Sequence, residues 1–118
     1  WCVFGCGGNR DEGKRPIMGE IAELFADHIV ITDDNPRDEP GDRIVSQILS
    51  GIKKYQNVSI IRNRGEAISY AIASASPADL ILIAGKGHET YQEISGGRVL
   101  FSDKVHAKSA LKARGSVT

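Results

Sequence analysis

Residues 28–52, HIVITDDNPRDEPGDRIVSQILSGI, decide the fold because they contain a strand, a loop and a helix in direct succession. Residues 29–32 are all β-branched, as is typical of a buried strand. From residue 41 onward the apolar side chains fall on one face of a helix: Ile44, Ile48, Leu49 and Ile52. A charged loop joins the two elements. The stretch therefore predicts one unit of an α/β protein.

Two further units follow the same plan, and a fourth strand comes after them. An apolar run at residues 1–6 precedes a predicted helix at 15–26, and a strand at 58–61 precedes a helix at 64–75. Residues 79–85, DLILIAG, form a fourth strand without polar alternation, which predicts a strand covered on both faces. In the first helix the residues predicted to face the core are Ile17, Ile21, Leu24 and Phe25. These units predict a parallel sheet with helices on both sides.

The last part of the chain follows a different pattern. Residues 91–101 contain two short strand-like segments around Gly96 and Gly97, which indicates a β-hairpin. Residues 102–113 then predict a helix capped by Ser102 or Asp103. A length of 118 residues predicts one domain, 1–118. Because Trp1 already belongs to a predicted strand, we expect this domain to be cut from a longer chain.

Composition excludes several classes of protein. The chain carries 15 basic and 15 acidic side chains, so it lacks the basic surface of a nucleic-acid-binding protein. No apolar run is long enough to span a membrane, and no signal sequence opens the chain. Cys2 and Cys6, on one predicted strand, would lie about 13 Å apart, too far for a disulfide. Free thiols favour a cytoplasmic location.

Glycines and charged residues gather in the four strand-to-helix loops, at 5–14, 33–40, 62–65 and 84–90. In an open parallel sheet these loops meet beyond the carboxyl ends of the strands, where ligands bind. The helix-to-strand connections at the other edge are ordinary turn sequences. This asymmetry predicts a binding site, although the glycines of the first loop are equally explained by a tight turn.

Two loops contain residues suited to bind an amino acid. The Arg37 guanidinium offers a fork for a carboxylate, while Asp34 and Asn35 offer acceptors for an ammonium group. A turn capped by an aspartate and stiffened by Pro36 explains those residues without a ligand, but it does not explain Arg37. The loop at 84–90 adds three more polar side chains: Lys86, His88 and Glu89. His88 is a candidate for direct chemistry or for positioning.

Two explanations account for the presence of cations at the start of the first predicted helix. Lys14 and Arg15 face the positive end of the helix dipole, which is unfavourable unless an anion lies nearby. An anionic ligand would supply that charge, and simple solvation of two surface cations explains the residues as well.

Several common motifs are absent. A P-loop that ended in Gly85 and Lys86 would need another glycine six residues before Lys86, where the chain has Leu80. The glycine segment that begins at Gly5 has Arg10 where a dinucleotide fingerprint has its last glycine. The three histidines have no metal-ligand spacing, so we predict no metal site. No residue can be named as the catalytic base.

Three segments together resemble a known family: VFGCGGNRDEGKRPIMG at 3–19, TDDNPRDE at 32–39 and AGKGHETYQ at 84–92. In order and spacing they resemble the C-terminal domain of the Mur ligase family, especially its members that add meso-diaminopimelate to UDP-MurNAc-L-Ala-D-Glu in peptidoglycan biosynthesis. The resemblance implies a Rossmann-like three-layer αβα domain with a mostly parallel sheet and a C-terminal hairpin. It also implies an ADP-forming ligase that uses ATP and Mg²⁺, bound mainly by a central domain outside this chain, so the isolated domain is expected to be inactive.

The resemblance also assigns roles to residues. Arg37 would bind the distal carboxylate of diaminopimelate, and Arg10 another carboxylate. Asp34 and Glu89 would face ammonium groups, Asn35 belongs to the matching motif, and Gly85 would let a backbone carbonyl approach the ligand. Lys14 and Arg15 would lie near the nucleotide phosphates. Independently of the resemblance, Lys86 and His88 are candidates for positioning roles.

Two alternatives from other classes remain. A free-standing nucleotide-binding module would bind adenine nucleotides tightly by itself, but Arg10 breaks the fingerprint that such a module needs. A non-catalytic interaction domain would use the charged edge to dock a protein. The convergence of four polar loops at one sheet edge disfavours that alternative.

Overall fold

A computed structural model describes residues 1–115. Four strands form one parallel sheet in the order β3-β2-β1-β4, which confirms the predicted architecture. The strands are short: β1 Cys2–Phe4, β2 Ile29–Ile31, β3 Val58–Ile60 and β4 Leu82–Ile83. The chain runs outward from β1 through β2 to β3, and then returns to place β4 on the other side of β1. The loops after β1 and β4 therefore flank the point where ligands bind in open α/β sheets.

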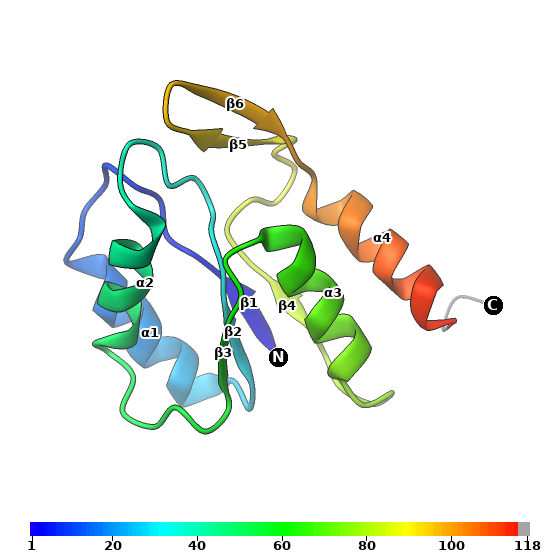
Figure 1. Cartoon of the computed structure of the whole chain (residues 1–118). Helices are drawn as coiled ribbons and strands as arrows, with labels where there is room; N and C mark the ends of the chain where they lie inside the picture. The colour runs from blue at the N-terminus through cyan, green and yellow to red at the C-terminus, as the bar shows by residue number, and fades with distance from the viewer. Residues whose placement is uncertain (116–118) are drawn as a thin grey trace.

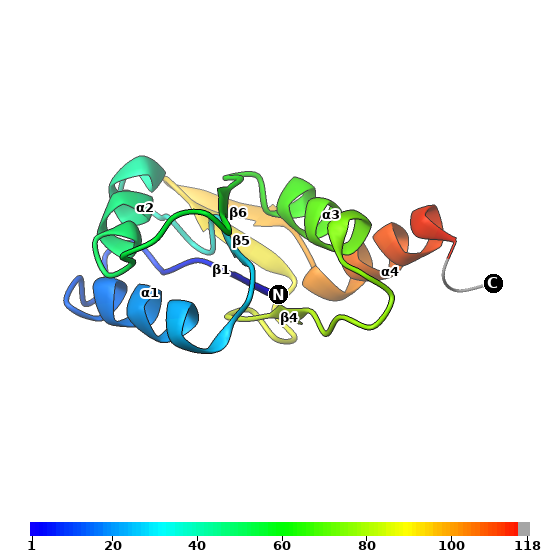
Figure 2. The same cartoon turned by 90° about the horizontal axis from the view of Figure 1, so that it is seen from below.

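Helices cover both faces of the sheet and give three layers (Figures 1 and 2). The first two helices, α1 Lys14–Phe25 and α2 Gly41–Leu49, lie on one face. On the other face lies α3 Arg64–Ser74, with α4 Asp103–Arg114 packed beside it. Of the two caps proposed for the last helix, Ser102 is the one found, since its hydroxyl accepts from the Val105 N–H at 3.3 Å.

The sheet divides the core into two halves because successive side chains of a strand point to opposite faces. Phe4, Ile29 and Ile31 face α1 and α2, whereas Val3 and Val30 face α3. Each half is completed by the apolar side of its helices, for example Ile44 and Ile48 of α2 in the first half. All three residues of β2 are therefore buried, two against one layer of helices and one against the other.

The prediction for the apolar face of α1 is wrong. The four side chains predicted to enter the core are 50–80% exposed: Ile17, Ile21, Leu24 and Phe25. The helix instead buries Gly19 and Ala22, because it crosses α2 at very short distance. A Cβ atom at Gly19 would lie 2.2 Å from the Ile48 carbonyl oxygen, so only glycine permits this contact. Close packing of small residues therefore decides which face of α1 is buried.

The prediction that the fourth strand is covered on both faces is also wrong. Leu80 is 83% and Leu82 58% exposed, so one face of this segment is left open within residues 1–115. A hollow of about 670 Å³ lies between α1 and β4, lined partly by Ile21, Phe25 and Leu82. It opens at the amino ends of the strands. The hollow is therefore remote from the convergent polar loops.

A hairpin of β5 Tyr91–Ile94 and β6 Gly97–Leu100 lies across the loops at the carboxyl edge of the sheet (Figure 1). An isolated bridge pairs Arg37 with Ile94, and the Arg37 N–H donates to the Glu93 carbonyl at 2.9 Å. The hairpin is thereby attached to the loop that follows β2. This attachment brings residues from 33–37 and 91–94 into one site.

Both cysteines are free thiols, as predicted. Cys6 is buried beside Met18, and burial raises the pKa of its thiol to about 11. Among residues 1–115 no helix is both long and apolar enough to cross a bilayer.

Candidate functional site

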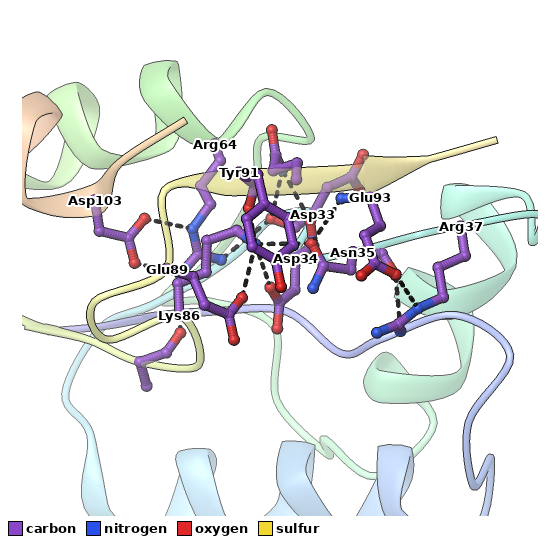
Figure 3. A network of polar contacts seen from close by, with 12 residues as sticks. Asp33, Asp34, Asn35, Arg37, Arg64, Lys86, Glu89, Tyr91, Glu93 and Asp103 are labelled. Carbon is purple, nitrogen blue, oxygen red and sulfur yellow. Dashed lines mark hydrogen bonds and ion pairs between the residues drawn. The ribbon is translucent and has the colours of Figure 1, made fainter. Parts of the chain in front are cut away.

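A buried lysine lies at the centre of the carboxyl edge (Figure 3). The Lys86 ammonium group donates to Asn35 Oδ1 at 2.8 Å and to the Tyr91 carbonyl at 3.0 Å. It also lies 2.9 Å from Asp34 Oδ1 and 3.6 Å from Glu89 Oε1. The Lys86 side chain is fully buried, so its charge is balanced within the chain. Lys86 therefore joins the loops after β2 and β4 to the hairpin.

Two carboxylates beside Lys86 retain capacity to accept hydrogen bonds. Asp34 Oδ1 and Glu89 Oε1 are buried, yet neither accepts a hydrogen bond of good geometry within residues 1–115. Their contacts with Lys86 are ion pairs. Two carboxylates against one ammonium group leave a net negative charge at this point of the edge, which suits a second, external cation.

Arg37 lies on the other side of Asn35, within the same edge (Figure 3). Its Nε donates to Glu93 Oε2 at 2.7 Å, and its Nη1 donates to the Gly8 carbonyl at 2.9 Å. The loop after β1 approaches closely because Gly8 has no side chain: a Cβ there would lie 1.8 Å from the Pro36 oxygen. The structure therefore brings Asp34, Asn35 and Arg37 together with the first glycine loop.

The remaining candidate residues are placed as follows. Gly85 adopts φ +112°, and a Cβ there would lie 3.2 Å from Asp34 Oδ2, so the loop after β4 lies directly against Asp34. Arg10 is exposed, and its Nη1 donates to the Asn9 carbonyl at 3.1 Å. Lys14 and His88 are also exposed. Asp34, Asn35, Arg37, Gly85, Lys86 and Glu89 thus form one cluster, and the other three lie outside its contacts.

Arg15 differs from the other cations because it is buried. Its guanidinium donates to both carboxylate oxygens of Glu39 at 2.7 and 2.8 Å, and to the Gly7 carbonyl at 2.8 Å. The anion that balances Arg15 at the start of α1 is therefore Glu39. The burial of Arg15 rules out simple solvation as its explanation, and Glu39 balances its charge without a ligand anion.

The Arg15–Glu39 pair makes a testable contribution to stability. Hydrogen bonds from Arg15 and from the Asn9 N–H lower the pKa of Glu39 from 4.5 to about 2. A carboxyl whose pKa is lower in the folded state stabilises that state above its unfolded pKa and loses this effect as pH falls. We expect Glu39→Gln to lower the free energy of unfolding by about 2 kcal/mol at pH 7.

Urea unfolding at several pH values checks this contribution. The difference between wild type and Glu39→Gln is expected to shrink as pH falls from about 4.5 toward 2. Glu20→Gln, on the exposed side of α1, is the control and should show no such difference. A constant difference across this range would show that Glu39 acts through packing rather than through its charge.

A buried ion pair that the sequence did not indicate connects loops at the carboxyl edge of the sheet to α4. Arg64, at the start of α3, donates to both oxygens of Asp103 at 2.7 and 2.8 Å. It also donates to the carbonyls of Asp33 at 3.1 Å and Ala84 at 2.9 Å. Arg64 therefore holds two of the site loops and the start of α4. Its place in a loop that follows a strand was visible in the sequence, but its partners were not.

The hairpin contributes two further residues that the sequence did not indicate. Gln92 donates to the Asp34 carbonyl at 2.9 Å, and the Glu93 N–H donates to Asn35 Oδ1 at 2.9 Å. Gln92 ends the segment 84–92 that resembles the family, but no role was assigned to it, and Glu93 lies just beyond that segment. Both act through the docking of the hairpin onto a loop that is distant in sequence. Within residues 1–115 no group of three or more His, Cys, Asp or Glu side chains could hold a metal ion.

Comparisons with known proteins identify the family and the fold of this chain. A family model described as "Mur ligase, glutamate ligase domain" matches residues 1–87. The UDP-N-acetylmuramoyl-L-alanyl-D-glutamate--2,6-diaminopimelate ligase of Acidovorax sp. (strain JS42) is 54% identical over 117 residues, which are 99% of this chain and 23% of that protein. The protein of the same name from Xanthomonas oryzae pv. oryzae (strain MAFF 311018) is 56% identical over 113 residues, 96% of this chain and 23% of its own length.

A solved structure of a UDP-N-acetylmuramoyl-L-alanyl-D-glutamate--2,6-diaminopimelate ligase superposes on this chain with a TM-score of 0.92 at 44% sequence identity. The match covers 98% of this chain and 24% of that one. The chain thus spans about a quarter of the length of the relatives it matches. The family model, the relatives and the shared fold lead to one conclusion: the chain belongs to the Mur ligase family.

Proposed function

We propose that this chain is the amino-acid-binding domain of a longer, ADP-forming ligase that adds meso-diaminopimelate to UDP-MurNAc-L-Ala-D-Glu in bacterial peptidoglycan synthesis. The observation that carries the proposal is that the Arg37 guanidinium lies at the same sheet edge as two carboxylate oxygens, of Asp34 and Glu89, that accept no hydrogen bond within residues 1–115. The names of the relatives supply the substrate. The rest of the enzyme, including its N-terminal and central domains, would lie outside this chain, and a cytoplasmic location suits its free thiols.

The charges of the site match those of diaminopimelate. This amino acid carries two carboxylates and two ammonium groups, one of each at either end. Arg37 and the exposed Arg10 would bind carboxylates, and the net negative charge around Lys86 would bind an ammonium group. L-Lysine lacks the distal carboxylate and would leave the Arg37 end without a partner. Arg37 therefore makes the site selective for diaminopimelate over lysine.

The domain would act by placement of the amine. A bound amino acid whose amine lies close to the activated carboxyl carbon reacts as in an intramolecular step, which removes much of the entropic barrier. Lys86 would maintain the loops that hold the ligand, because its buried ammonium group joins Asp34, Asn35 and Tyr91. His88 and Lys14, both exposed near this edge, would face the rest of the enzyme.

We infer that ATP and Mg²⁺, which the resemblance to the family implies, are bound mainly by the central domain outside this chain. The pairing of the buried Arg15 guanidinium with Glu39 supports that assignment. A free-standing nucleotide-binding module is the alternative, and the names of the relatives disfavour it.

A backbone amide NMR titration tests the proposal. We expect meso-diaminopimelate to shift the signals of Asn35, Arg37, Gly85 and Glu89, and L-lysine at equal concentration to leave Arg37 unshifted. Equal shifts with both ligands would contradict the selectivity assigned to Arg37. If neither ligand shifts these signals in this chain and in the complete ligase, the proposed site is wrong.

A further inference from the structure

Arg37 has an unusual backbone conformation, which contacts with neighbouring residues must stabilise. Its φ angle is +55°, in the left-handed region that residues other than glycine rarely adopt. Such a conformation persists only where neighbouring contacts hold it. The contacts around Arg37 therefore bear on how its side chain is presented.

One residue, Glu93 of β5, contacts Arg37 at both ends (Figure 3). The Glu93 carbonyl accepts from the Arg37 N–H at 2.9 Å, and Glu93 Oε2 accepts from Arg37 Nε at 2.7 Å. The Glu93 N–H donates to Asn35 Oδ1 at 2.9 Å, the same atom that accepts from Lys86. Glu93 thus connects the arginine to the buried lysine of the site.

The hydrogen bonds of Arg37 leave a defined part of the guanidinium available. Nε donates to Glu93, and Nη1 donates to the Gly8 carbonyl at 2.9 Å and more weakly to the Asn35 carbonyl at 3.5 Å. Nη2 has no hydrogen bond to any residue in 1–115. A carboxylate can therefore bind at Nη2 while Glu93 keeps its bond to Nε, because a guanidinium carries five donors.

We propose that Glu93 is a positioning residue that orients Arg37 and so sets the preference of the site for an amino acid with a distal carboxylate. This inference rests on the proposed function. The charge of Glu93 is shared, since its Oε1 lies 3.7 Å from Arg98 Nη2 and its side chain is 29% exposed. Glu93 supports Arg37 through a hydrogen bond in a fixed geometry, and the ligand carboxylate supplies the opposing charge.

Steady-state kinetics of the complete ligase test this role through Glu93→Ala and Glu93→Gln. For Glu93→Ala we expect the KM for diaminopimelate to rise about tenfold to a hundredfold, since a misplaced contact has effects of this size. The kcat and the KM of the other substrates should stay within about threefold. Glu93→Gln keeps an acceptor for Arg37 Nε and should remain within about threefold of wild type in all constants.

Glu20→Ala, exposed on α1, is the matched control and should match wild type. An unchanged KM in Glu93→Ala would overturn the proposal, and so would a lowered KM, which would mean that Glu93 competes with the ligand for Arg37. The proposal would also be overturned if Glu93→Ala and Glu93→Gln showed the same rise in KM together with a lower melting temperature and a lower kcat. That result would show that Glu93 has a structural role only.

The Arg37→Ala variant separates this inference from the proposed function. If Arg37→Ala retains diaminopimelate addition, the assignment of Arg37 in the proposed function fails. If Arg37→Ala loses it while Glu93→Ala keeps wild-type constants, only the role of Glu93 fails.

Discussion

Replacement of Arg37 by alanine in the complete ligase is expected to remove most of the activity for diaminopimelate addition. The guanidinium is partly buried, with only 19% of its side chain exposed, and it is already fixed by Glu93 and Gly8. Removal of one partner of a buried, hydrogen-bonded charge pair costs about 2–5 kcal/mol, much of it because the other charge is left unpaired. That range corresponds to roughly 30-fold to several thousandfold in kcat/KM.

Product formation measured at several diaminopimelate concentrations checks this prediction. Arg43→Ala is the matched control, because Arg43 lies 54% exposed on α2, where it pairs with Glu12 at 2.6 Å and with Glu39 at 3.3 Å rather than with the cluster around Lys86. The control should keep kcat/KM within about twofold of wild type. Activity of Arg37→Ala within tenfold of wild type would remove Arg37 from the role assigned to it.

Replacement of Arg64 by alanine is expected to give the largest loss of stability. The Arg64 side chain is fully buried and forms four hydrogen bonds, to Asp103, Asp33 and Ala84. Its removal leaves the buried Asp103 carboxylate without its partner, which costs about 3–5 kcal/mol. A domain of this size has a total stability of only about 5–15 kcal/mol. The free energy of unfolding of Arg64→Ala should therefore be close to zero if the wild-type domain lies at the low end of that range.

Urea unfolding of Arg64→Ala, Asp103→Ala and the double variant measures this effect. We expect the double variant to be less destabilised than the sum of the single variants, because it buries no unpaired charge. Arg62→Ala is the control: Arg62 lies two residues away, is 42% exposed and pairs with Asp33 and Asp42. The free energy of unfolding of Arg62→Ala should fall by less than about 1 kcal/mol. Additive losses would show that Arg64 and Asp103 do not stabilise each other.

The sequence by itself determined the order of strands and helices and the edge at which polar loops gather. Residues 29–32 identify a strand buried on both faces, and Ile44 and Ile48 identify the buried side of α2. These features depend on neighbours along the chain, whose spacing is fixed by the geometry of strands and helices. For the same reason Arg37, Asp34 and Glu89 could be assigned to one edge, since strand-to-helix loops of parallel strands lie together.

Only the tertiary structure decided which side of α1 is buried and which charges find partners inside the chain. The small residues Gly19 and Ala22 pack inward because α1 and α2 approach too closely for larger side chains, which leaves Phe25 exposed. The pairs Arg15–Glu39, Arg37–Glu93 and Arg64–Asp103 each join segments that lie at least 24 residues apart. Charged groups pair by distance and burial in space, and neither quantity is encoded in the local spacing of the sequence.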